Sequence, residues 1–244
     1  MLARKAFAAL VILVLAAGTA AADLKVVKQT HVDGFTIMGQ SQPPTDKEQI
    51  TWIGTDKMNM NQGDTATIVR LDLMKLFVID HSRKVYHVLD LPVDLNQLVP
   101  PQMKQMLSMM QFDVTVTPSD ESKQVGEWPA RRYDMTMSSP MFTMKSTMWV
   151  TKVAGYDPAT FGQMYSYLNS LQPGMADAVK EMSKVDGLVV EQAGVMSMAN
   201  SEVATSEKTV SIENLDAPAG TYDPPAGYSE EPFDFMASLQ QRGH

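Results

Sequence analysis

The chain has 244 residues, no cysteine and 20 methionines, and its formal net charge is −8. The absence of cysteine excludes disulfides, a lipid-modified cysteine, a thiolate metal site and a cysteine nucleophile. The acidic balance makes nucleic acids and anionic membrane surfaces poor partners, so we expect no nucleic-acid binding. No linker rich in Pro, Gly and Ser interrupts the chain, which favours one domain.

The N-terminus has the layout of a cleaved secretory signal. Arg4 and Lys5 form a basic start, residues 6–15 are apolar, and Ala20 to Ala22 offer a small-residue cleavage site. The apolar run is shorter than the about 20 residues that a membrane-spanning helix needs, although an uncleaved anchor is the alternative. We expect a soluble periplasmic protein that is not a lipoprotein, with a signal at 1–22, one half-barrel domain at 23–228 and a tail at 229–244.

Residues 24–92 alternate apolar and polar side chains between turn sequences, which predicts an antiparallel meander. Ile50 and Trp52 fall on one side of a strand. In the run "TATIVRLDLMKLFVID", Val69, Leu71 and Leu73 recur at period two. The sequences "QGD" and "HSRK" predict turns.

The period then changes from two to that of a helix. Pro100 and Pro101 stand where a helix can begin. Apolar residues follow at i, i+3, i+4 and i+7, which predicts one apolar face of an amphipathic helix formed by Met103, Met106, Leu107 and Met110.

Strands, two helices and two more strands are expected after residue 112. Tyr133, Met135 and Met137 share one face of a strand, and Phe142, Met144, Met148 and Val150 share one face of the next. "DPATFGQMYSYLNSLQ" predicts a helix capped by its aspartate, and "GMADAVKEMSKV" predicts a second helix. The Pro- and Gly-rich end of the chain predicts an extended surface segment, and "DFMASLQQ" fits a short helix.

The search for catalytic motifs is nearly empty. None of the sequence patterns HExxH, GxSxG, GxGxxG or the P-loop occurs, and the four histidines are scattered. A Ser-His-Asp triad assembles in space rather than in sequence, so its absence from the sequence is not decisive. We expect a protein that is not an enzyme and has no cofactor.

The methionines allow three interpretations. Thioethers without cysteine suit Cu(I), and "KMNMNQGD" and "YDMTMSSPMFTM" have M-x-M spacing, but no histidine lies close by. Methionine also suits a cavity for apolar ligands, because its flexible side chain repacks around varied shapes, or it simply fills a core. A long antiparallel sheet with few helices favours the cavity, because such sheets curl and their concave face must be filled.

The element order and several phrases resemble a known family. They include "WIGTDKM", "TATIVRLDLMKLFVIDHSRKVYHVLDLP", "VTPSDESKQVGEWPARRYDM" and "MWVTK". Over roughly residues 24–215 the chain is similar to a domain-of-unknown-function family of exported bacterial proteins that resembles the LolA/LolB-like lipoprotein-carrier superfamily.

The resemblance implies an α+β fold, in which a strongly curved antiparallel sheet forms an incomplete barrel and helices cover its concave face. In the relatives this cavity holds acyl chains. The resemblance therefore makes the helix over Met103–Met110 a lid. The expected ligand-binding residues are Trp52, Met103, Met106, Leu107, Met110, Tyr133, Met135, Met137, Phe142 and Met144.

Together these features predict a non-enzymatic periplasmic protein that binds an apolar ligand, such as a lipid or a lipoprotein acyl chain. The first alternative is a periplasmic protein that binds Cu(I) through methionine. The second is an envelope interaction module without a ligand, which pairs an exposed sheet edge with an envelope protein.

Overall fold

The computed structural model describes residues 23–37, 40–94, 98–99, 112–169, 176–198 and 201–235. The predicted signal at 1–22, the predicted helix over Met103–Met110 and the end of the tail at 236–244 lie outside these residues.

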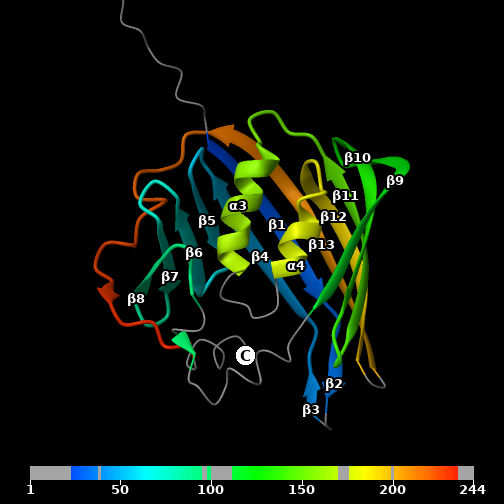
Figure 1. The fold of residues 1–244 in the computed structure, drawn as a ribbon, viewed down its shortest axis with the longest axis horizontal. Coiled ribbons are helices and arrows are strands. Elements are labelled where there is room, and N and C mark those ends of the chain that lie inside the picture. Colours follow the sequence, from blue (N-terminus) through cyan, green and yellow to red (C-terminus); the bar gives the residue numbers. More distant parts are fainter. Residues whose placement is uncertain are drawn as a thin grey trace, which may run out of the picture.

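The protein is mainly β, so the α+β prediction is wrong. Strands account for 58% of the described residues and helices for 10%, and one 12-stranded sheet that does not close forms the body of the molecule. Two short helices pack against part of one face and do not form a layer over a barrel. The physical reason is the length of the strands, which reach 13 and 15 residues and leave few residues for helices (Figure 1).

The sheet has the strand order β14-β8-β7-β6-β5-β4-β1-β13-β12-β11-β10-β9. Neighbouring strands are antiparallel, except that β14 runs parallel to β8. The strands of the sheet are β1 (Asp23–Val32), β4 (Thr45–Ile53), β5 (Lys57–Asn61), β6 (Thr65–Arg70), β7 (Lys75–Asp80), β8 (Val85–Asp90), β9 (Asp113–Val125), β10 (Trp128–Ser138), β11 (Thr143–Thr151), β12 (Leu188–Met198), β13 (Ser201–Leu215) and β14 (Ser229–Glu230). A separate hairpin consists of β2 (Phe35–Ile37) and β3 (Gln40–Gln42).

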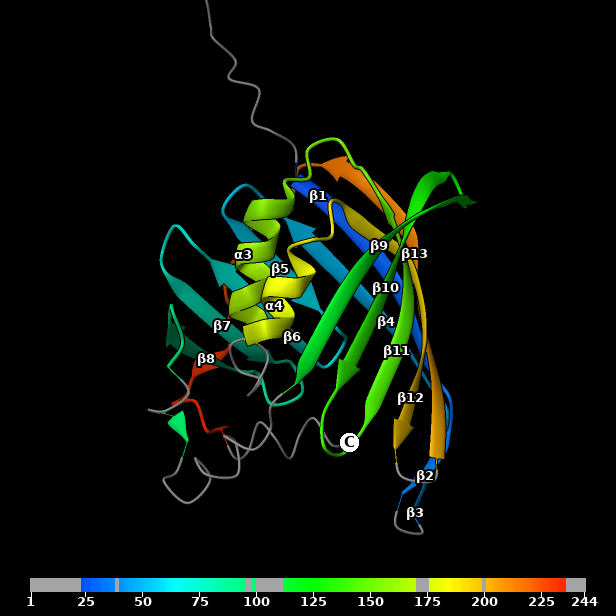
Figure 2. The same cartoon turned by 45° about the vertical axis from the view of Figure 1, so that its right-hand side comes forward.

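The first strand lies in the middle of the sheet. β4 to β8 form one meander and β9 to β13 form the other, and β1 pairs with β4 on one side and β13 on the other. Figure 2 shows β7 and β8 toward the left of the view and β10 to β12 toward the right, with β1 between them. β1 therefore joins the two halves.

One strand ends inside a run of alternating apolar residues. Val69, Leu71 and Leu73 recur at period two in the sequence, but β6 ends at Arg70 and residues 71–74 form a turn. Met74 adopts a φ of 50°, and half of the Leu73 surface is exposed. Apolar residues that alternate across a turn keep their period in the sequence, although the chain reverses direction. The "HSRK" turn is confirmed at residues 81–84.

Two helices occur in the described residues, α3 (Pro158–Asn169) and α4 (Ala176–Met182). The predicted cap of α3 is confirmed, because the Asp157 carboxylate accepts hydrogen bonds from the backbone N–H groups of Ala159 at 3.2 Å and Thr160 at 3.1 Å. The Thr160 hydroxyl donates to the same carboxylate, and these bonds lower the pKa of Asp157. α4 ends four residues before the predicted end at Asp186.

Both helices pack on one face of the sheet, which we call the helix face. Met164 of α3 is fully buried there, and Ala178 of α4 is 2% exposed. The apolar residues beneath α3 come from β1, β4 to β8 and the start of β12, and they include Leu24, Val26, Ile53, Met58, Val69, Leu76, Leu89 and Leu188.

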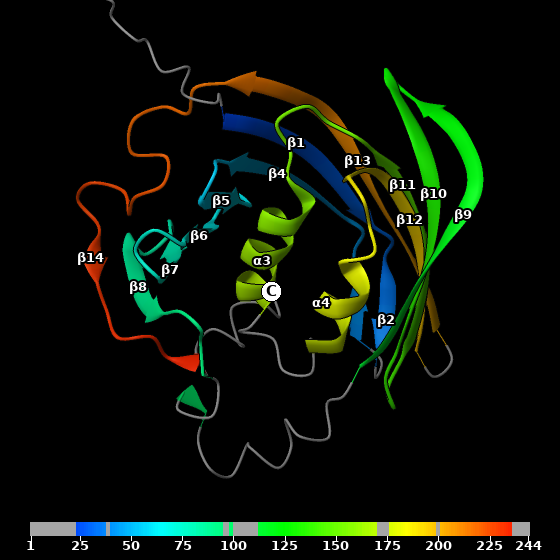
Figure 3. The ribbon, with the colours of Figure 1, turned by 45° about the horizontal axis from the view of Figure 1, so that its top comes forward.

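Residues 216–235, which we call the C-terminal strap, cover the opposite face of β4 to β8 through Ala217, Tyr222 and Tyr228. The end of the strap reaches the helix face, where Phe233 packs. Tyr222 of the strap is 7% exposed and packs with Ala66, Ile68 and Ile79. Ile68 and Val69 are neighbours on β6, so their side chains point to opposite faces. Figure 3 shows the strap running outside β8 while the helices lie inside. The strap includes β14, where the separate tail was expected to begin.

Within the described ranges, no helix combines the length and the apolar character needed to cross a membrane.

Candidate functional site

A cavity of about 130 Å³ lies between the two helices and strands β9 to β12. Four methionines line it, so we call it the methionine cavity: Met135, Met137, Met148 and Met182. The other lining residues are Val114, Tyr165, Ala178, Val179 and Gln192.

The strand pairing brings the sheet methionines together. Met135 and Met137 are two residues apart on β10 and therefore point to one face. On the neighbouring β11, Met148 lies directly opposite Tyr133, and Met144 lies opposite Met137. Directly opposed residues share a face of the sheet, so all of these side chains point toward the helices.

α4 supplies the other wall through Ala178 and Met182, which are four residues apart on one side of the helix. Ala178 is buried, and its small side chain leaves the space that a larger residue would fill. On the sheet side, Met148 is fully buried and Met135 is 8% exposed. Four of the nine lining residues are buried, and the other five are half-buried. The walls are thus mainly apolar, and the cavity is partly enclosed.

Only two of the lining side chains carry polar groups. Gln192 of β12 donates a hydrogen bond from its amide nitrogen to the Ser146 hydroxyl at 3.1 Å. The Tyr165 ring stacks on Phe161 within α3, with ring centroids 5.8 Å apart. These groups give the cavity a polar edge without a catalytic arrangement.

The structure brings some of the residues expected to bind a ligand together. Tyr133, Met135, Met137 and Met144 belong to one apolar cluster, although only Met135 and Met137 line the cavity. Phe142 lies at the margin, where its ring is 5.8 Å from that of Phe112.

Trp52 is placed elsewhere. It packs under the C-terminal strap with Phe77 and Tyr86. Its neighbour Ile53 points to the helix face, and successive residues on a strand point to opposite faces, so Trp52 points away from the helices. The other expected residues lie outside the described part of the chain: Met103, Met106, Leu107 and Met110.

Several lining residues were not expected from the sequence. Ala178 and Met182 carried a usable signal, since residues four apart on a predicted helix share a face. Met148 carried another, because it alternates with Met144. Gln192 and Val114 carried no such signal, since nothing in the sequence places β12 and β9 beside this cavity.

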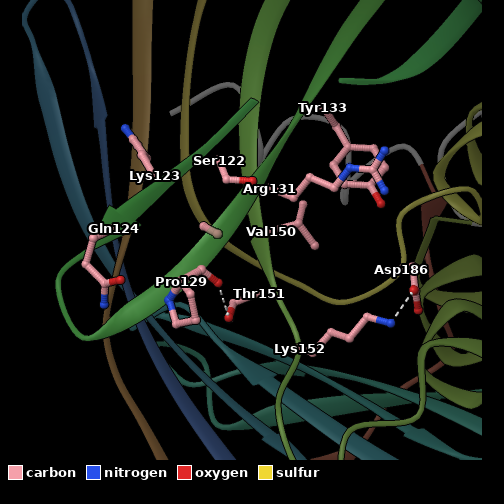
Figure 4. Close-up of a pocket in the computed structure, with 11 residues that line it drawn as sticks. Ser122, Lys123, Gln124, Pro129, Arg131, Tyr133, Val150, Thr151, Lys152 and Asp186 are labelled. Carbon is pink, nitrogen blue, oxygen red and sulfur yellow. Dashed lines mark hydrogen bonds and ion pairs between the residues drawn. The ribbon is translucent and has the colours of Figure 1, made fainter. Parts of the chain in front are cut away.

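A second, larger depression of about 630 Å³ lies where β9 and β11 end and β10 begins (Figure 4). We call it the basic groove. Arg131, Lys152 and Asp186 stand at its rim, and Tyr133 and Val150 form part of its floor. Lys152 pairs with Asp186 at 2.8 Å, and this hydrogen bond raises the pKa of Lys152, which keeps the ammonium charged at neutral pH.

The structure describes three of the four histidines, namely His31, His81 and His87. Among the described residues, no group of three His, Cys, Asp or Glu side chains is arranged to hold a metal ion. Both ring nitrogens of His31 face carboxylates, Asp46 at 2.7 Å and Asp33 at 3.1 Å, and Asp46 contributes most to its raised pKa. His31 therefore has no ring nitrogen left to serve as the base of a nucleophile.

No protein-family model and no curated protein matches the chain. Among solved structures, one described as PNGF-II matches with a TM-score of 0.42 and 10% sequence identity. The match covers 90% of this chain but 32% of the other, so the chain spans about a third of that protein's length. A similarity at this score supports no inference about fold or activity.

Proposed function

We propose that the protein is a non-enzymatic binding protein whose methionine cavity holds the apolar part of a ligand, such as a lipid acyl chain. The observation that carries the proposal is the partly enclosed space between α4 and the sheet, which is lined by four methionines and Ala178. Native cores are packed to crystal density with few voids larger than a water molecule, and here a space remains unfilled between mainly apolar side chains.

The volume limits what can enter. An apolar cavity of about 150 Å³ can bind benzene, whereas sites for drug-sized ligands measure about 300–1,000 Å³. At about 130 Å³ the cavity has room for the end of a chain. A longer chain requires the cavity to expand, which methionine favours because its unbranched side chain repacks at low cost. α4 also has only seven residues, so little intrahelical bonding opposes its displacement.

The cellular location belongs to the same proposal, namely an exported protein that acts in the periplasm. The tripartite N-terminus supports export, and Asp23, the residue expected to follow cleavage, lies in β1. Asp23 takes part in the fold, since its carboxylate accepts a hydrogen bond from the Ala217 backbone at 3.2 Å. N-terminal sequencing of the protein from a periplasmic extract should begin at Asp23, and a sequence beginning at Met1 would contradict export by cleavage.

Ligand binding can be tested by filling the cavity. Ala178→Leu adds three carbons to the wall of the cavity, whereas Ala193→Leu adds them on an exposed position of β12. We expect wild type and Ala193→Leu to bind the fluorescent fatty acid cis-parinaric acid, and Ala178→Leu to bind it about tenfold more weakly or not at all. Thermal unfolding should show Ala178→Leu to be as stable as wild type. Equal affinity of all three proteins, or no binding by wild type, would contradict the proposal.

A second candidate function is Cu(I) binding, which the same four methionines favour because thioethers are soft ligands. Replacement of Met135 and Met182 by leucine separates the two functions, since it removes sulfur but nearly conserves volume. Titration with Cu(I) against a competing chelator should show a site that the double variant lacks if copper is the ligand. Fatty-acid binding that survives the double substitution, with no stoichiometric copper site in wild type, would reject copper.

A further inference from the structure

Tyr133 of the basic groove lies directly opposite Met148 of the methionine cavity on neighbouring strands, and we propose that the ligand is an anionic amphiphile. Its charged headgroup, a carboxylate or phosphate, binds between Arg131 and Lys152, while its apolar tail enters the methionine cavity. This inference rests on the proposed function, since it names the class of ligand that the cavity takes.

The first support is a local reversal of charge. The chain carries a net charge of −8, yet the groove is lined by Lys123, Arg131 and Lys152 against one acid, Asp186. Figure 4 shows Lys123 apart from the other two cations. Lys123 is also engaged by Glu191 and lies over the Trp149 ring, so Arg131 and Lys152 are the cations that an anion in the groove would meet.

The present partners of these two cations are weak. Lys152 and Asp186 are 82% and 63% exposed, and Arg131 approaches Asp120 only to 3.5 Å, with both side chains largely in solvent. Exposed ion pairs of this kind contribute about 0–1 kcal/mol to stability. Replacing the carboxylate partner of Arg131 or Lys152 by a ligand anion therefore costs little. The Arg131 Nε donates to the Ser119 carbonyl at 2.7 Å, which holds the guanidinium in place.

The floor of the groove is apolar and leads toward the cavity. Arg131 lies opposite Val150, and Tyr133 lies opposite Met148, so one step along β10 and β11 passes from the groove to the cavity. Tyr133 and Met135 are two residues apart, a distance of about 7 Å along a strand. The Tyr133 ring lies 6.0 Å from the Arg131 guanidinium and is 4% exposed, which places a charged rim directly above an apolar wall.

Neighbouring cations do not share this arrangement. Arg132 forms ion pairs with Glu121 at 2.9 Å and Asp134 at 3.0 Å, which occupy its guanidinium. Lys145 of β11 is exposed, and it alternates with Met144, so it points away from the helix face. Lys145 therefore offers a control with the same change of charge on the same strand.

The test compares cis-parinaric acid with its methyl ester, which share a tail but differ in charge. We expect wild type to bind the acid about tenfold more tightly than the ester. The double variant Arg131→Gln, Lys152→Gln should bind both ligands with the affinity of the ester, and Lys145→Gln should behave as wild type. Added salt should weaken binding of the acid by wild type and leave the ester unaffected.

The outcomes separate the headgroup site from the cavity. Equal affinities of wild type for acid and ester would overturn the headgroup site while leaving the apolar cavity standing. If neither ligand binds, the proposed function itself fails. Inorganic phosphate should displace the acid only in large excess, because it lacks a tail. Displacement of the acid by an equal concentration of phosphate would show that the groove binds free anions. That result would overturn the proposal that the ligand is an amphiphile.

Discussion

Met148 of β11 lies directly opposite Gln192 of β12, and both side chains line the methionine cavity. Met148 is fully buried, whereas the Gln192 amide is bound to the Ser146 hydroxyl one step along β11. The boundary between the apolar wall of the cavity and its polar edge thus falls between two neighbouring residues.

The burial of Met148 predicts a large loss of stability on truncation. Met148→Ala should lower the free energy of unfolding by about 2–5 kcal/mol, because it enlarges a space that is already incompletely filled. Met141 is 77% exposed, so Met141→Ala should change it by less than about 0.5 kcal/mol. Chemical denaturation measures both. Similar midpoints for the two variants would show that Met148 does not support the core.

The ion pair between Lys28 and Glu207 joins β1 to β13 at 2.6 Å, with the two side chains only 16% and 27% exposed. Glu207→Gln should lower the free energy of unfolding by about 1.5–3 kcal/mol, because it leaves a half-buried ammonium without its charged partner. Lys28→Met combined with Glu207→Gln should lose less than the sum of the single changes. Strict additivity in this double-mutant cycle would show that the pair contributes nothing.

The cap of α3 predicts a pH dependence. The pKa of Asp157 is lowered below its ordinary value of 3.8, so its contribution to stability is present above that pH and is lost as the pH falls through the folded-state pKa. Asp157→Ala should therefore lower Tm at pH 7 and have less effect at pH 2.5. Asp157→Asn keeps a capping side chain that does not titrate, and it should retain its stability at low pH. A difference between wild type and alanine variant that does not vary with pH would contradict this assignment.

The C-terminal strap should depend on the Tyr222 ring. Tyr222→Ala should cost about 3–5 kcal/mol, because the ring fills the apolar cluster with Ala66, Ile68 and Ile79. Tyr222→Phe keeps the ring and should cost less than about 1.5 kcal/mol. Limited proteolysis should cleave the strap of the alanine variant first. Equal resistance of both variants would show that other contacts hold the strap, such as the Arg70–Asp223 pair at 2.7 Å.

The sequence pattern predicted the structure correctly where a single local rule decides it, such as alternation along a strand or capping of a helix. Alternation placed Tyr133, Met135 and Met137 on one face, as observed, and the Asp157 cap marked the start of α3. The same rule could not place Trp52, because alternation assigns residues to two faces without saying what covers either. The strap that buries Trp52 is rich in Pro and Gly and has no period to reveal it.

The prediction of the fold class was wrong for a related reason. The two helices were expected from the sequence. The number of strands that join into one sheet was not, because it depends on which strands pair over long distances in the chain. β1 pairs with β13, nearly the whole chain away, and no local signal encodes that pairing. The cavity depends on it as well, since Gln192 reaches the site only through the order of β11, β12 and β13.

The central place of β1 has a consequence for how the chain acquires its structure. Lys28 of β1 pairs with Glu207 of β13, which follows it by 179 residues. The middle of the sheet therefore cannot form until almost all of the chain is available. Contacts between residues so distant in sequence make folding slow, because a large loop must close before they can form. Until β13 arrives, β1 has an open edge that can pair with another chain, and a polypeptide truncated before residue 201 should aggregate rather than fold.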